Sequence, residues 1–202
     1  MNFAKVKEKD PLDLPVLLKS RLGGLVAYIR QKMDQAEWEA LSLTDIAKDN
    51  RMTLPQLMEF GFTKANLVCH AVVASHEQMS QKFVGTQLAD LAGTLTEQVK
   101  TYLLALYQHD VPQIDFRSAS QGYAWQWSLM DEDRVINQAM KLMTPVYLAL
   151  FDANFTQLDA RCQAIWALYQ QGLRVAAVQK GRAEDCLQAI SPALDVLIGK
   201  PA

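Results

Sequence analysis

Apolar side chains recur three and four residues apart along most of this chain, which is the spacing of one face of an α-helix. The pattern is clear in QAIWALYQQGLRVAAVQK, residues 163–180. The 202 residues include nine glycines and seven prolines, too few for a sheet-rich or disordered protein. The sequence therefore predicts an all-α protein with about nine helices.

In the second part of the chain the helical pattern covers 95–109, 115–129, 133–155, 158–179 and 183–198. Pro145 is expected to kink or divide the third of these segments, because proline removes a helical hydrogen bond. Lys180-Gly181 is a helix stop signal between the last two segments.

In the first part of the chain, an amphipathic helix is expected from Asp13 to Met33. Gly23-Gly24 lies inside this helix, and each glycine weakens a helix by about 1 kcal/mol relative to alanine. The pair therefore indicates either close packing or a kink at this point.

Two pairs of residues have the pattern of helix N-caps in the segment that follows. Ser42 precedes Asp45 by three positions, and Thr53 precedes Gln56 by three. In each pair a hydroxyl and an acidic or amide side chain can satisfy the free N–H groups at a helix start.

These capping boxes predict two short helices, over 43–48 and 54–60, joined by a turn at 49–52. Thr63 is a third N-cap candidate and opens a long helix toward Phe83. Two short helices joined by a tight turn form the helix-turn-helix pattern.

Charge is nearly balanced along the chain, with a formal net charge of −2. The first 67 residues carry 10 Lys and Arg against 9 Asp and Glu, and the remainder carries 10 against 13. The resulting charges, +1 and −3, have the sign expected of a DNA-binding head but are too small to decide the function.

No window approaches the ~18 uninterrupted apolar residues needed to cross a bilayer, and the N-terminal segment lacks an apolar core of signal-peptide length. Cys69, Cys162 and Cys186 are widely separated within helical pattern, which fits reduced thiols better than a disulfide framework. Both observations predict a cytoplasmic protein without a membrane partner.

The helix-turn-helix segment resembles the TetR family of bacterial repressors. Its members carry an aromatic residue, a hydroxyl cap, an Asp-Ile-Ala run, a turn, a recognition helix and a lysine that opens the next helix. The matching residues, aligned without insertion or deletion, are Trp38, Ser42, Asp45-Ile46-Ala47, Met52-Thr53, Leu57, Lys64 and Leu67. The resemblance implies a DNA-binding head over 1–67 and a ligand-binding and dimerisation body over 68–202.

The resemblance assigns DNA contacts to a small set of positions. They are Ser42, Arg51, Thr53, Leu54, Gln56, Met58 and Lys64. Glutamine suits adenine, an apolar side chain suits a thymine methyl group, and basic side chains suit phosphate. An N-terminal arm with Lys5, Lys7 and Lys9 can add cationic contacts.

The contact positions also depart from the family pattern. The family's turn usually contains Ala-Gly where this chain has Asn50-Arg51, so either Asn50 takes the positive φ that glycine permits or the turn differs. Met58 replaces a tyrosine that often contacts phosphate, and Phe60-Gly61 replaces His-Phe. Glu59 adds a negative charge where phosphate is expected.

The resemblance further implies an effector pocket in the helical body. The candidate lining residues are Tyr102, Phe116, Tyr123, Trp127, Met130, Met143 and Tyr147. Ligand cavities are mostly apolar with few polar groups, so the expected effector is a small apolar molecule. The alternative is that these side chains form ordinary core.

The last two predicted helices carry more apolar surface than one small body readily hides. The candidate interface residues are Trp166, Tyr169, Leu173, Leu187, Ile190 and Leu194. Two antiparallel helices from each of two copies can form a four-helix bundle, so a two-fold homodimer is predicted. Such a dimer would carry two heads suited to a palindromic operator.

Metal and catalytic sites are not predicted. His70, His76 and His109 lack the spacing of metal ligands, and Cys69 points to a different helix face from its neighbour His70. The chain has no nucleophile elbow, phosphate loop or spaced carboxylate pair. Neither an enzyme nor a cofactor is therefore expected.

Together these patterns predict a dimeric, ligand-responsive transcriptional regulator of the repressor type, which binds operator DNA. The alternative is a TetR-fold ligand-binding or protein-interaction module whose head has lost sequence-specific DNA binding.

Overall fold

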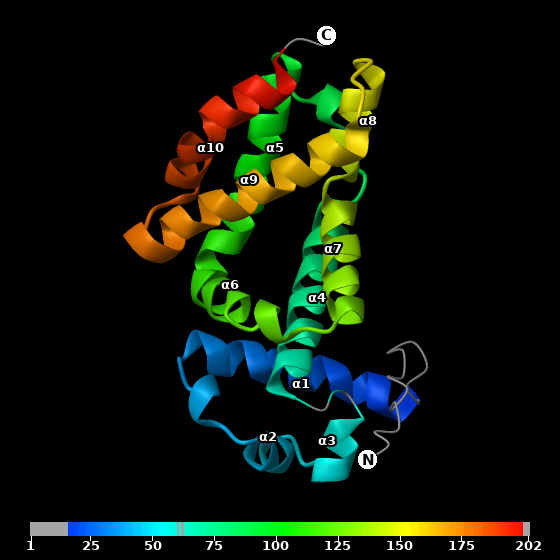
Figure 1. Ribbon diagram of the computed structural model, residues 1–202, viewed down its shortest axis with the longest axis vertical. Helices are drawn as coiled ribbons and strands as arrows, with labels where there is room; N and C mark the ends of the chain where they lie inside the picture. Colours follow the sequence, from blue (N-terminus) through cyan, green and yellow to red (C-terminus); the bar gives the residue numbers. More distant parts are fainter. Residues whose placement is uncertain (1–15, 60, 62, 200–202) are drawn as a thin grey trace, which may run out of the picture. The chain divides into compact units, whose positions relative to one another are not determined.

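The computed structural model describes residues 16–59, 61 and 63–199, and of residues 16–20 the backbone alone. Within these ranges the chain folds into α-helices α1 to α10, joined by turns and short 3₁₀ segments, and contains no β-strand (Figure 1). The predicted all-α class is confirmed for the described residues, and the number of helices is close to the number expected.

Contacts between residues divide the chain into two compact units, Met1–Ala71 and Val72–Ala202. The division falls within α4 (Lys64–Lys82), whereas the boundary expected from sequence follows residue 67. We call these units the head and the body.

The head contains α1 (Val16–Asp34), α2 (Leu43–Asp49), α3 (Leu54–Met58) and the first turns of α4. Its apolar side chains form a core whose fully buried members include Leu25, Ile29, Trp38, Ile46, Leu57 and Leu67. Burial of these side chains stabilises the short helices α2 and α3, since isolated helices of this length are marginal.

Helix α1 runs unbroken through Gly23-Gly24. A Cβ atom added at either glycine would meet no other atom within 4 Å. Of the two alternatives for this pair, close packing is therefore wrong, and the kink stays a prediction. The start of this helix expected at Asp13 lies outside the described residues.

The body contains α5 (Leu95–Asp110), α6 (Ile114–Gln121), α7 (Leu129–Leu142), α8 (Thr144–Asp152), α9 (Leu158–Gln179) and α10 (Ala183–Ile198). Helices α9 and α10 form a hairpin that packs on α5 (Figure 1). The core between them includes the buried side chains Leu103, Leu106, Tyr107, Ile165, Tyr169, Leu173, Cys186, Ile190 and Leu194.

Several helix ends lie where local sequence signals predict them. Helix α9 ends before Lys180, whose left-handed φ of 56° terminates the helix, as the stop signal predicts. Pro145 lies in the first turn of α8, where it separates α7 from α8, so the predicted division is confirmed.

The single helix expected over 115–129 is wrong. Helix α6 ends at Gln121, and α7 begins at Leu129 after Ser128. The Ser128 hydroxyl accepts a hydrogen bond from the Asp131 backbone N–H at 3.2 Å. This N-cap starts a new helix inside the segment in which periodicity alone indicated a continuous one.

Cys69, Cys162 and Cys186 are free, buried thiols, as expected. Burial raises the pKa of the Cys162 thiol to about 11. Among the helices that the structure describes, none is both long and apolar enough to cross a membrane.

Candidate functional site

Helix α2 begins with the capping box that the sequence predicts. The Asp45 backbone N–H donates to Ser42 Oγ at 3.2 Å, and the Ser42 N–H donates to Asp45 Oδ2 at 2.9 Å. Hydrogen bonds from the Ser42 hydroxyl and backbone lower the pKa of Asp45. The Asp45 carboxylate at this helix start is therefore stabilised in its charged form.

Helix α3 begins with the second predicted box. The Gln56 N–H donates to Thr53 Oγ1 at 3.4 Å, and the Thr53 N–H donates to Gln56 Oε1 at 2.9 Å. Bidentate recognition of adenine needs both polar atoms of a glutamine side chain. The cap bond already holds Oε1 of Gln56 toward the Thr53 backbone, which restricts the orientation of the amide.

The turn between α2 and α3 has its positive φ at Arg51, not at Asn50. Arg51 has φ 53°, whereas Asn50 has φ −95° and donates its side-chain amide to Ile46 O at 2.8 Å. The Met52 N–H reaches back to Ala47 O at 2.9 Å, and the Arg51 N–H to Lys48 O at 3.1 Å.

This pair of bonds is the Schellman motif, which places the residue after the C-cap in the left-handed region. Of the two alternatives for this turn, the one in which Asn50 takes the positive φ is therefore wrong, because Asn50 is itself the C-cap of α2. Arg51 fills the position where glycine is the usual residue.

The outer side of α3 presents side chains that a partner can reach. Thr53, Leu54, Gln56 and Met58 are exposed, and Leu57 is fully buried beneath them. Glu59, also exposed, adds a carboxylate to this surface. The positions Phe60, Phe62, Lys5, Lys7 and Lys9 lie outside the described residues.

Lys64, expected to contact phosphate, is bonded within the head. Its Nζ atom donates to Trp38 O at 2.6 Å and to Glu39 O at 3.2 Å, and it lies 5.0 Å from the Trp38 ring centroid. Partial burial lowers the pKa of Lys64, an effect that the Glu39 carboxylate opposes. Lys64 thus links the start of α4 to the 3₁₀ segment Trp38–Ala40.

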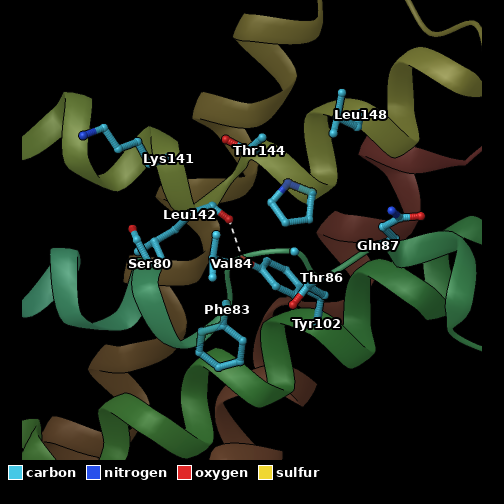
Figure 2. A pocket seen from close by; sticks show the side chains of 12 residues that line it. Ser80, Phe83, Val84, Thr86, Gln87, Tyr102, Lys141, Leu142, Thr144 and Leu148 are labelled. Carbon is cyan, nitrogen blue, oxygen red and sulfur yellow. Dashed lines mark hydrogen bonds between the residues drawn. The ribbon is translucent and has the colours of Figure 1, made fainter.

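In the body, a pocket of about 390 Å³ lies beside α4, α5, α7 and α8 (Figure 2). Its lining is mainly apolar and consists of Ser80, Phe83, Val84, Gly85, Thr86, Gln87, Tyr102, Lys141, Leu142, Thr144, Pro145 and Leu148. The Tyr102 hydroxyl donates to Leu142 O at 2.7 Å, and its ring meets that of Phe83 edge-on at 5.9 Å. The volume falls in the usual range for small-molecule sites.

The predicted ligand-binding residues do not converge on this pocket. Tyr102 lines it, whereas Met143 and Tyr147 line a separate pocket of about 330 Å³ with Cys162. Phe116 and Tyr123 are buried, Trp127 and Met130 are half-buried, and these four line neither pocket. The sequence missed Ser80, Phe83 and Leu148, because no local pattern shows that the end of α4 and the middle of α8 lie beside the same pocket.

A buried polar cluster joins four helices of the body. The Arg117 Nη2 donates to Asp110 Oδ1 at 2.7 Å, and the Tyr169 hydroxyl donates to Asp110 Oδ2 at 2.9 Å. The Trp166 ring stacks on Tyr169 at 5.1 Å and meets the ring of His76 edge-on at 5.5 Å. No sequence pattern indicated this cluster, because its members are brought together only by the packing of distant helices.

Most of the residues predicted to form a dimer interface lie in the core of a single chain. Tyr169, Leu173, Ile190 and Leu194 are buried in the core of the body, and Trp166 and Leu187 are half-buried. The periodic pattern shows that a helix face is covered, but not whether its own chain covers it. The outer surfaces of α9 and α10 instead expose Val178 (76%) and Val196 (80%).

No group of three or more His, Cys, Asp or Glu side chains in the described part of the chain is arranged to hold a metal ion. A scan against protein-family models and a search of curated proteins both find no significant match to this chain. The family resemblance inferred from the sequence therefore stays a prediction.

Proposed function

We propose that this protein is a TetR-like, dimeric transcriptional regulator that binds operator DNA and is modulated by a small apolar effector. The observation that carries the proposal is the α2–α3 pair. Each helix has a complete capping box, the turn closes by a Schellman motif, and α3 exposes its polar and apolar side chains.

The contact chemistry is modest and comes from few side chains. Arg51 supplies a cation in the turn, Thr53 retains a hydroxyl donor, and Leu54 suits a thymine methyl group. Lys64 is not counted among the phosphate contacts because its ammonium group binds backbone carbonyls. Each phosphate contact that is absent reduces the salt dependence of binding by about one power of the salt concentration.

Effector control would act through the body. An apolar ligand would bind in the pocket beside Phe83 and Tyr102. If the pocket binds it more tightly in one arrangement of the two heads of a dimer, the ligand would raise the population of that arrangement. The exposed faces of α9 and α10, with Val178 and Val196, offer apolar surface for pairing two copies. Two heads related by a two-fold axis would select a palindromic site.

The test is selection of bound sequences from a random DNA pool, using the full chain at low salt. We expect an enriched palindrome whose binding weakens in Arg51→Asn, since asparagine tolerates the left-handed region but removes the charge. Gln56→Ala should relax preference at one base pair. Failure to enrich any sequence would sink this proposal.

Lys64 variants are unsuitable for this test because they disturb the fold of the head. Lys48→Gln is the better control, since Lys48 is an exposed cation on α2 that precedes Arg51 by three residues. If Arg51→Asn loses DNA binding and Lys48→Gln does not, the loss comes from a contact made by Arg51 in the turn and not from the change in net charge.

A second function has its own support: a TetR-fold ligand-binding or protein-interaction module without sequence-specific DNA binding. The internal bonds of Lys64 and Gln56 and the carboxylate of Glu59 favour it. A chain that binds a small ligand but enriches no DNA sequence would support this function over the first.

A further inference from the structure

The pocket of Figure 2 is one part of a longer groove in the body. A pocket of about 490 Å³ adjoins it, and the two share Thr86, Gln87, Pro145 and Leu148. The second pocket continues along α8 as far as Asp152 and Ala153. A single elongated molecule can therefore occupy both, with Leu148 at their junction.

The groove is lined mainly by hydrocarbon. Phe83, Val84 and Leu142 line the first pocket, and Leu88, Leu95 and Ala149 line the second. Leu148 (54% exposed) and Val84 (81% exposed) remain open to solvent. Apolar surface of this kind gains free energy when an alkyl chain covers it.

The charged side chains Lys141 and Asp152 lie toward opposite ends, and the neutral Thr86 and Gln87 lie where the two pockets meet. In Figure 2, Lys141 and Ser80 lie on the side opposite Leu148 and Gln87, with Lys141 extending from the rim. The Lys141 ammonium donates to the neutral Gln138 Oε1 at 2.9 Å and has no salt bridge within the described chain. The Ser80 hydroxyl is buried and forms no hydrogen bond with any described residue. Asp152 lies at the other end.

We propose that this groove binds an amphiphile with a long hydrocarbon chain and an anionic head group, its head at Lys141. The positive end attracts the head. An anion at the opposite end would face Asp152, which fixes the orientation. The inference rests on the proposed function only in naming this ligand as the effector.

Isothermal titration of the full chain with dodecanoate below its micelle concentration tests the proposal. Affinity should rise about twofold to fourfold for each methylene added between hexanoate and dodecanoate. Dodecyltrimethylammonium should bind about twofold to fivefold more weakly than dodecanoate, because an exposed ion pair contributes little. No measurable binding of dodecanoate, or tighter binding of the cation, would overturn the proposal.

Leu148→Trp fills the junction of the two pockets and should weaken dodecanoate binding at least tenfold. Phe151→Trp is the matched control, since Phe151 lies on the same helix, is 60% exposed and lines neither pocket. Val84→Trp provides a second block if Leu148→Trp fails to fold. Equal binding by a folded blocking variant and the control would place the ligand elsewhere and refute the proposal.

Lys141→Gln should remove the preference for dodecanoate over dodecyltrimethylammonium, whereas Arg174→Gln, an exposed change on α9, should preserve it. Sedimentation with phosphatidylglycerol vesicles separates a free amphiphile from a membrane surface. Binding to vesicles without binding to dodecanoate would contradict the proposal.

The titrations contain no DNA. A chain that binds dodecanoate but enriches no operator therefore retains this inference and loses the proposed regulatory function. A chain that enriches an operator but binds no amphiphile loses only the inference.

Discussion

The Tyr169 hydroxyl donates to Asp110 Oδ2 over 2.9 Å in the interior of the body, where both side chains are fully buried. The other oxygen of Asp110 accepts from Arg117. Burial, followed by the nearby Asp110 charge, raises the pKa of Tyr169 far above its ordinary value, so the phenol remains a donor. The carboxylate is thus held by a cation and a neutral donor at once.

Asp110→Asn should lower the free energy of unfolding by about 3–5 kcal/mol, because it leaves the Arg117 guanidinium buried without its counter-charge. Urea unfolding of the full chain measures the loss. Asp115→Asn is the control: Asp115 and Lys180 are both largely exposed and 3.9 Å apart, so this change should cost less than about 1 kcal/mol. Equal losses of unfolding free energy in the two variants would contradict the larger contribution expected from the buried ion pair.

His76 should make stability fall below pH 6.5. Burial, and then the charge of Arg117, hold the pKa of His76 well below its usual 6.5. The unfolded chain therefore binds a proton below that pH and the folded chain does not, which lowers stability by about 1.4 kcal/mol per pH unit. Urea unfolding between pH 5 and about 6.5 measures this slope.

His76→Phe should remove that contribution to the slope, and His109→Asn, which leaves His76 in place, should retain it. An unchanged slope in His76→Phe would mean that other groups carry the pH dependence.

The same substitution should have opposite effects at two glycines. A Cβ at Gly172 would collide with the Tyr107 hydroxyl and lie 2.9 Å from Cys186 O, so Gly172→Ala should cost about 1–3 kcal/mol. Tyr107 cannot move freely because its hydroxyl donates to Tyr169 O at 3.0 Å. Gly24→Ala, in open space on α1, should stabilise by about 0.5–1 kcal/mol. Thermal unfolding of both variants checks the signs.

Arg51→Gly should raise stability by about 0.5–1 kcal/mol, since it relieves a positive φ at a residue with a side chain. Arg51→Ala removes the same charge but keeps the strain and should give no such gain. If both variants lose DNA binding while only one gains stability, the side chain has a contact role distinct from its role in the turn.

Lys64→Met should destabilise the head by about 1–3 kcal/mol, because it leaves two backbone carbonyls without their charged donor. Lys48→Met, at an exposed position on α2, is the comparison and should change stability by less than about 0.5 kcal/mol. Similar effects of the two changes would contradict the structural role of Lys64.

Local signals predicted the helices well where one residue pair decides a boundary. The capping boxes at Ser42 and Thr53 and the helix stop at Lys180 depend only on residues close in sequence, so they could be predicted without knowledge of the fold. The break between α6 and α7 was missed because the apolar pattern continues through Ser128. Hydrophobic periodicity takes no account of an N-cap such as this serine.

The candidate sites were harder to predict because they depend on contacts between distant residues. Met58 and Leu54 are exposed on α3, but nothing local shows that the Lys64 ammonium turns inward to Trp38, 26 residues away. Tyr169 and Leu194 have the pattern of an interface, yet their own chain covers them. Pocket residues such as Ser80 come from helix ends that meet only in the fold.

The ion pair of Arg117 also ties α6 to α5 in the interior of the body. Helix α6 has eight residues, too few for a stable isolated helix. Its detachment would strip Arg117 from Asp110 and leave the carboxylate without its cation in the interior. The backbone amide protons of α6 should therefore exchange with solvent as slowly as those of the long α9, through opening of the whole body.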